Sequence, residues 1–191
     1  MKWLQSFAVV GVAYILAHGL TAFLITPVQM RLLPEITSFA SLIYLPHGVR
    51  VLSTWLLGRI AFIPLAMGAF LSELLFTPAE FSTAWEPHIL LSIAVGAASS
   101  IVAFEVLRLA GRNLYAGQSY RVHWTWLLVV GGLASVLNSI GQAVVFSGSL
   151  LSGQFAGVLL VYALGDLCGL VVTTLALMLV FRRMRLGSSR G

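Results

Sequence analysis

Apolar runs recur along this chain at lengths that can cross a lipid bilayer as a helix. About 20 apolar residues are enough, because each helical residue rises about 1.5 Å. The 191 residues are 59% hydrophobic and only 9% charged. Short polar connectors separate the runs and leave no room for a soluble domain. The sequence therefore predicts an all-α, polytopic transmembrane helix bundle.

Six membrane spans are expected, within a single integral membrane domain that covers residues 1–191. They lie approximately at residues 5–26, 38–57, 60–76, 88–110, 124–147 and 155–181. The first run continues past Ile25 without a clear small-x-small cleavage site, so we expect a retained span and not a signal peptide. A basic cytoplasmic tail is expected over residues 182–191.

The basic residues divide unevenly between the two sides of the predicted bundle. Connectors on the N-terminal side carry nine of them, and the other side carries Arg31 alone. The nine are Lys2, Arg59, Arg108, Arg112, Arg121, Arg182, Arg183, Arg185 and Arg190. Because basic loops stay in the cytoplasm, both termini are predicted to be cytoplasmic in a multi-pass protein of the cell inner membrane. The net charge of +5 thus reports topology and contact with membrane lipid, and not nucleic-acid binding.

Small residues that allow close helix contact are spread over several spans. Packing within the chain is the simpler expectation, and docking on a partner membrane protein is the alternative. The candidate positions are Ala13, Ala17, Gly48, Gly165 and Gly169.

The predicted spans also contain polar and charged residues, which are costly in hydrocarbon. His47 and Arg50 are three residues apart and share one helix face. Arg50 has no acid within four residues, so we expect a partner on another helix, and a direct pair with Asp166 is one hypothesis. The candidates for a ligand site or an intramembrane ion pair are His47, Arg50, Asp166, Asn138, Gln142 and Glu73.

Three interpretations of Arg50 stay open: a structural ion pair, a cavity that holds a carboxylate or another anion, or a side chain that reaches to the interface. His18 is interpreted as a packing histidine, and Glu105 with Arg108 as a pair that neutralises itself. No catalytic or nucleotide-binding motif and no metal-ligand spacing is found. The chain is therefore predicted to be no enzyme and to carry no metal or cofactor.

Two motifs resemble those of a known family. Tyr44 precedes Pro46-His47-Gly48, a leucine-rich run leads to Gly58, and Pro64 and Gly68-Ala69-Phe70-Leu71 follow. Gly165-Asp166-Leu167-Cys168-Gly169 forms a Gly-Asp-x-x-Gly element in the last span. Together they resemble the membrane-associated sensor domain of the first type, an input module of bacterial signalling proteins. The resemblance implies a short, stand-alone six-span version, with Asp166 and the Pro46–Arg50 element as the positions that matter.

The expected function is a non-enzymatic sensory or accessory module that binds a small ligand or a partner membrane or signalling protein. One alternative is the substrate-binding component of a vitamin-type transporter, since such components have six spans and dock through small residues like Ala13 and Ala17. Another alternative is a structural subunit of a membrane complex.

Overall fold

The computed structural model describes residues 2–32, 41–77, 83–117, 123–146 and 155–188. Helices make up nearly all of these residues, so the all-α prediction is confirmed. Four helical runs are long and apolar enough to cross a membrane: Trp3–Leu32, Leu45–Phe76, Pro87–Leu109 and Trp124–Val145. The chain therefore has the character of a membrane helix bundle. Residues 38–40 and 147 of the predicted spans, and 189–191 of the predicted tail, lie outside the described part.

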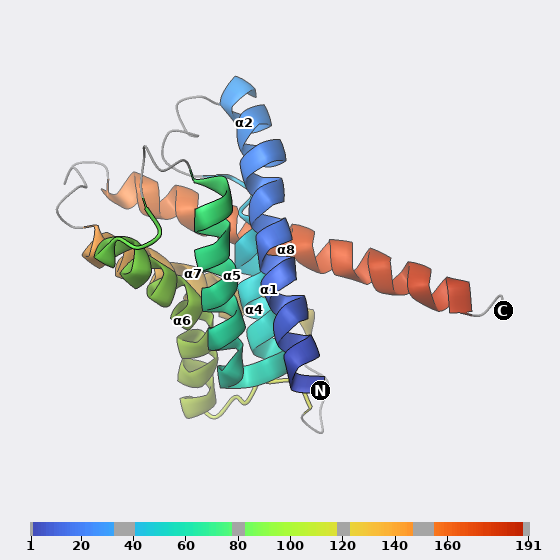
Figure 1. The fold of residues 1–191 in the computed structure, drawn as a ribbon. Helices are drawn as coiled ribbons and strands as arrows, with labels where there is room; N and C mark the ends of the chain where they lie inside the picture. The colour runs from blue at the N-terminus through green and yellow to red at the C-terminus, as the bar shows by residue number, and fades with distance from the viewer. Residues whose placement is uncertain (1, 33–40, 78–82, 118–122, 147–154, 189–191) are drawn as a thin grey trace.

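The N-terminal rod consists of α1 (Lys2–Leu20), the π-helical turn η1 (Thr21–Ile25) and α2 (Thr26–Leu32). Figure 1 shows them as one long helix along the bundle. The wider turn precedes Pro27, whose ring has no N–H to donate and crowds the preceding turn of a regular helix. The Thr21 hydroxyl donates to the carbonyl of Ala17 at 3.0 Å. The proline at position 27 thus accounts for the wider turn.

Helices α4 (Leu45–Leu57) and α5 (Phe62–Phe76) form a hairpin that is joined by the short 3-10 helix η2 (Gly58–Ala61). Gly58 has a φ of 66°, a conformation that suits glycine, and it ends α4. Figure 1 shows α4 and α5 both rising from the turn that joins them, so the chain runs down α4 and back up α5. The run Leu45–Phe76 therefore reverses direction at Gly58 instead of continuing straight.

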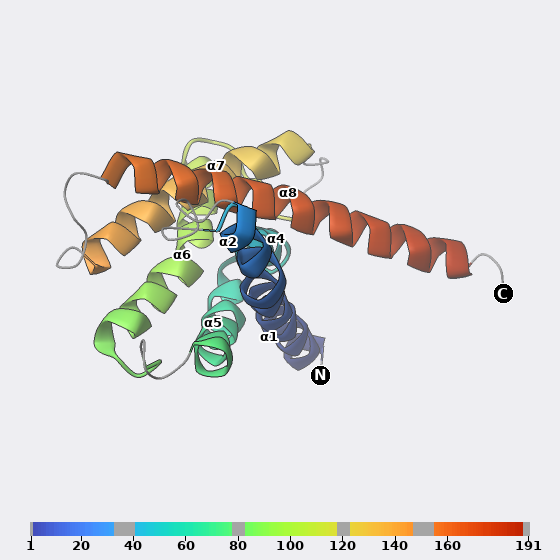
Figure 2. The same ribbon diagram turned by 90° about the horizontal axis from the view of Figure 1, so that it is seen from above.

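Helices α6 (Pro87–Leu109), α7 (Trp124–Val145) and α8 (Phe155–Ser188) complete the described fold. Helix α6 packs mainly on α7, and α8 packs on α4 and α7. Figures 1 and 2 show that α8 lies crosswise to α1 and not alongside it. The predicted sixth span, 155–181, falls inside α8.

Helix α4 occupies the centre of the bundle. All residues from Pro46 to Thr54 are buried, although this stretch includes a histidine and an arginine. One apolar cluster joins Val51 and Leu52 to α6, α7 and α8, and a second joins Val49 to α1 and α5. The large apolar side chains exposed elsewhere, such as Leu16 and Met178, are suited to face lipid. The polar residues of α4 are thus buried between other helices.

Candidate functional site

His47 and Asp166 meet in the centre of the bundle. Nδ1 of His47 lies 3.3 Å from Oδ2 of Asp166, with side chains that are 0% and 2% exposed. On the other side of the ring, Nε2 of His47 lies 3.1 Å from the carbonyl oxygen of Gly131 on α7. The imidazole therefore bridges α8 and α7 from its place on α4. The contact with Asp166 is at ion-pair distance but completes no hydrogen bond among the described residues.

Arg50 lies one helical turn after His47 and is 6% exposed. Its Nη2 donates a hydrogen bond to the hydroxyl of Tyr14 on α1 at 2.7 Å. Its guanidinium carbon is 5.6 Å from the ring centres of both Tyr14 and Tyr44, within cation–π range. Its Nε has no hydrogen-bond partner among the described residues. Two aromatic rings and one hydroxyl thus surround a buried positive charge.

The direct pair between Arg50 and Asp166 that the sequence suggested is wrong. Asp166 lies 3.3 Å from His47, and among the described residues no carboxylate lies within ion-pair distance of Arg50. The physical reason is the meeting of α4 and α8 at the first turn of α4, which brings Asp166 to His47. Arg50 is one turn further along and faces α1 and α6 instead.

The crossing between α8 and the start of α4 is a close backbone contact. The amide of Tyr44 donates to the carbonyl of Gly165 at 2.9 Å. A Cβ on Gly165 would lie 2.0 Å from the carbonyl oxygen of Ser41, and one on Gly169 would lie 2.0 Å from that of Tyr44. Only glycine fits such an approach. The two glycines of the Gly-Asp-x-x-Gly element therefore place Asp166 against His47.

The other small-residue positions also pack within the chain. A Cβ on Gly48 would meet Thr173 of α8 at 2.5 Å. Ala17 is buried and Ala13 is partly buried, both in the apolar cluster between α1, α4 and α5. These positions are occupied by contacts inside one copy of the chain, so they leave little surface for docking a partner at Ala13 and Ala17.

Asn138 and Gln142 form a separate polar pair between α6 and α7. The amide nitrogen of Gln142 donates to the carbonyl of Ser92 at 3.0 Å and to the side-chain oxygen of Asn138 at 3.3 Å. The first bond connects α7 to α6, as side-chain amides often do in membrane bundles, and the second lies within α7. These two residues thus have structural partners of their own.

His18 and Glu73 lie beside the polar centre, the group formed by His47, Asp166, Arg50, Tyr14 and Tyr44. The ring of His18 stacks on Phe76 at 5.7 Å and meets the edge of Tyr44 at 6.4 Å. Glu73 is close enough to His18 to interact with it electrostatically. His18 is therefore packed among aromatic rings, although its Nδ1 is buried without a hydrogen-bond partner in the described part of the chain.

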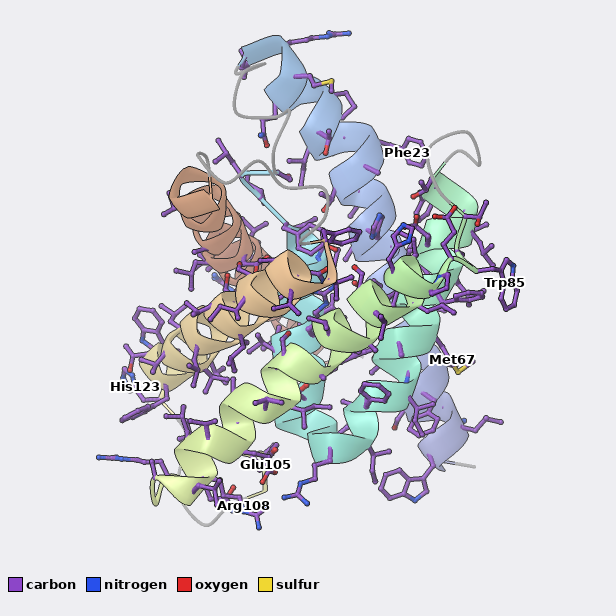
Figure 3. All side chains as sticks on the ribbon, turned by 90° about the vertical axis from the view of Figure 1, so that its left-hand side faces the viewer. Phe23, Met67, Trp85, Glu105, Arg108 and His123 are labelled. Atoms are coloured by element: carbon purple, nitrogen blue, oxygen red, sulfur yellow. The ribbon has the colours of Figure 1, made fainter. Side chains whose placement is uncertain are left out.

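Glu105 organises the end of the bundle at which α4 turns into α5. Arg59 donates to it from two nitrogens, the Tyr115 hydroxyl donates at 2.7 Å, and Arg108 lies 3.4 Å away. Burial and the hydrogen bond to Glu105 raise the pKa of Tyr115 well above its usual value. The predicted pair with Arg108 exists, but Arg59 is the closer partner. Figure 3 shows Glu105 and Arg108 together at this end of the molecule.

An apolar groove of about 340 Å³ lies at the far end of the N-terminal rod. Its lining residues come from η1, α2 and the segment before α4: Leu24, Ile25, Val28, Gln29, Leu32, Leu42 and Ile43. None of the predicted site residues lines it. The apolar groove and the polar centre are therefore separate features.

Sequence reasoning missed Tyr14 and did not connect Tyr44 with Arg50. The sequence did contain a signal for a polar face on the first span, because Tyr14 and His18 are four residues apart and so lie on the same side of that helix. Tyrosines facing a buried cation are a common way to satisfy it.

The assembled centre is a buried cation held by aromatic side chains, next to a histidine–carboxylate contact. A search of family models, curated proteins and solved structures found no match to this chain.

Proposed function

We propose that this chain is a non-enzymatic integral membrane module, of the sensory or accessory kind, that binds an anionic group at Arg50. The observation that carries the proposal is the guanidinium of Arg50, which is buried with no carboxylate at ion-pair distance among the described residues. An unpaired charge costs several kcal/mol in such a place, so it is retained where it has a function or a partner.

The immediate surroundings of Arg50 favour a planar anion such as a carboxylate. Tyr14 and Tyr44 each lie within cation–π range of the guanidinium, and one of its N–H groups is used by the Tyr14 hydroxyl. The Nε–H is left without an acceptor. Guanidinium groups bind carboxylates through paired N–H donors along one edge. A small carboxylate, or an acidic side chain of a partner membrane protein, fits this chemistry.

The proposed module has six spans with both ends in the cytoplasm. The support is the distribution of basic residues, because Arg59 and Arg108 lie together around Glu105 at one end of the bundle. Trp85 and Phe23 lie toward the other end (Figure 3). On this proposal the basic end faces the inner leaflet of a bacterial inner membrane and contacts its anionic lipids.

The test is gentle purification from the native membrane, followed by mass spectrometry of bound proteins and small molecules. We expect a stoichiometric anionic small molecule or an acidic partner segment in the wild type and its loss in Arg50→Gln. Arg59→Gln is the matched control, since Arg59 is exposed at the end of the bundle. A neutral, vitamin-like molecule retained by both variants would point to a transport component instead.

A second measurement covers the case in which Arg50→Gln fails to fold. Wild-type protein in nanodiscs is titrated with acetate and succinate, and its thermal unfolding temperature is recorded. A stabilising ligand raises this temperature by mass action. No bound anion or partner and no response to carboxylates would overturn the proposal.

A further inference from the structure

The ring of His47 lies between two hydrogen-bond acceptors. The carbonyl oxygen of Gly131 is 3.1 Å from Nε2, and a carboxylate oxygen of Asp166 is 3.3 Å from Nδ1. A carbonyl oxygen can only accept, so Nε2 carries a hydrogen. A neutral imidazole has one N–H, and its other nitrogen then presents a lone pair. That lone pair would point at the lone pairs of an ionised Asp166.

We propose that His47 and Asp166 form a buried proton-binding site, in which one proton is held between Nδ1 and Oδ2. The proton belongs either to an imidazolium beside a carboxylate or to a carboxylic acid that donates to Nδ1. In both forms each facing pair of atoms has one donor and one acceptor. Without the proton, two acceptors face each other in a region with almost no exposure to water.

Several charged and polar groups pack around the pair, and the positive charge of Arg50 interacts electrostatically with both His47 and Asp166. Arg50 on α4 donates to Tyr14 on α1, and Tyr44 and His18 lie on the same side of the centre. Glu73 on α5 is near His18. Helix α7 contributes the Gly131 carbonyl, and the buried hydroxyl of Ser135 lies one turn further along. The part of α6 at the centre contributes Gly96 against Arg50 and no charge.

Loss of the proton changes the charge of the centre by one unit. The attraction between His47 and Asp166 is then replaced by repulsion, so the Asp166 carboxylate has to find another donor. Arg50 is one turn from His47, and its Nε has no acceptor among the described residues.

Magic-angle-spinning NMR of ¹⁵N-histidine-labelled protein in lipid nanodiscs tests the site directly. The chain has four histidines, and His88→Gln, His123→Gln and His18→Gln assign three of the signals without touching the pair. The spectrum is recorded at mildly alkaline pH. His47 should be doubly protonated, or an infrared carbonyl band should report a protonated Asp166.

Asp166→Asn supplies the matched variant, because an asparagine amide can donate to a neutral Nδ1. In that variant we expect His47 to become neutral, or the infrared band to disappear. Glu86→Gln is the control, since Glu86 forms a comparable but exposed contact with His88 at 3.1 Å. It should leave the His47 signal unchanged.

A wild-type spectrum in which His47 is neutral while Asp166 is ionised would overturn the proton site. This result is decisive even if Asp166→Asn does not fold, because it requires only the wild type and the three assigning variants. The outcome is independent of whether an anion binds at Arg50.

Discussion

Gly96 of α6 lies directly against the guanidinium of Arg50 on α4. A Cβ built on Gly96 would be 2.7 Å from Nη2 and 2.9 Å from the guanidinium carbon. The absence of a side chain at this position creates the space that the positive charge occupies. Gly96 thus belongs to the polar centre, although it carries no polar side chain.

Replacing Gly96 with alanine is expected to displace the Arg50 guanidinium and weaken its hydrogen bond to Tyr14. Overpacking of this kind costs about 1–3 kcal/mol. The measurement is thermal unfolding in nanodiscs. The control is Gly132→Ala on α7, where the nearest atom to a new Cβ is 3.9 Å away. Equal stability of the two variants would show that Arg50 does not depend on this space.

Tyr14→Phe is expected to destabilise the fold by about 1–3 kcal/mol, because it removes the acceptor of a charged, buried donor. The phenylalanine ring still lies against the guanidinium, so the cation–π contact remains. Denaturation in mixed micelles measures the change. Tyr14→Leu removes both contacts and should cost more. If phenylalanine and tyrosine are equivalent at this position, the hydrogen bond at 2.7 Å contributes nothing to stability.

Gly169→Ala is expected to prevent native packing of α8 on α4. The new Cβ would lie 2.0 Å from the backbone oxygen of Tyr44, and a backbone cannot move aside as a side-chain end can. The loss should exceed that of Gly96→Ala, and size-exclusion chromatography should show aggregation. Gly11→Ala is the control, with its nearest atom at 3.9 Å. A monodisperse, stable Gly169→Ala protein would contradict the close crossing.

The pH dependence of Tyr115 follows from burial and from its bond to Glu105, which together raise its pKa. The neutral phenol is the donor, so its contribution to stability is present below the unfolded pKa of about 10. This contribution is lost as the pH rises through the higher pKa of the folded state. Ultraviolet titration of the wild type, with Tyr115→Phe subtracted, should show this late ionisation.

Glu105→Gln should lower the pKa of Tyr115 toward its ordinary value, while burial alone keeps part of the shift. Glu86→Gln, which changes an exposed acid before α6, should leave the titration unchanged. A Tyr115 signal that is insensitive to Glu105→Gln would exclude the bond at 2.7 Å as a cause.

Cysteine labelling tests the proposed orientation. With Cys168 replaced by serine, Ile60→Cys and Ala110→Cys should react with an impermeant maleimide only after the cells are opened. Thr83→Cys should react in intact spheroplasts. Ile60 is in the turn between α4 and α5, and Ala110 and Thr83 flank the two ends of α6. The reverse pattern, or labelling of Ile60 and Ala110 from opposite sides, would contradict it.

Much of the fold follows from local sequence signals. The apolar runs predicted helices in the right places, since a backbone in hydrocarbon must satisfy its own hydrogen bonds. Gly58 and Pro64 lie where α4 turns into α5, and Pro87 begins α6. The orientation of α8 across the bundle was not predictable, because its apolar residues surround the helix and give no preferred face.

The polar centre was predicted only in part. Charge in an apolar segment is costly wherever it lies, and this cost alone singles out His47, Arg50 and Asp166. The sequence does not predict which of these groups contact each other, because the contacts depend on how α4 crosses α8 and α1. Asn138 and Gln142 share a face of α7 as their spacing predicted and are bonded to each other, but the bond from Gln142 to Ser92 of α6 was not predictable from that spacing.

The sequence by itself determined that this chain is helical, apolar and built around a few charges that need partners, because these properties depend on composition and on spacing along one helix. The tertiary structure alone decided that His47 meets Asp166 while Arg50 meets Tyr14, Tyr44 and Gly96. The physical reason is that charged and polar side chains pair only within a few ångströms of each other. The distance between such side chains on different helices depends on how closely the helices approach, and glycines far apart in the chain fix that approach.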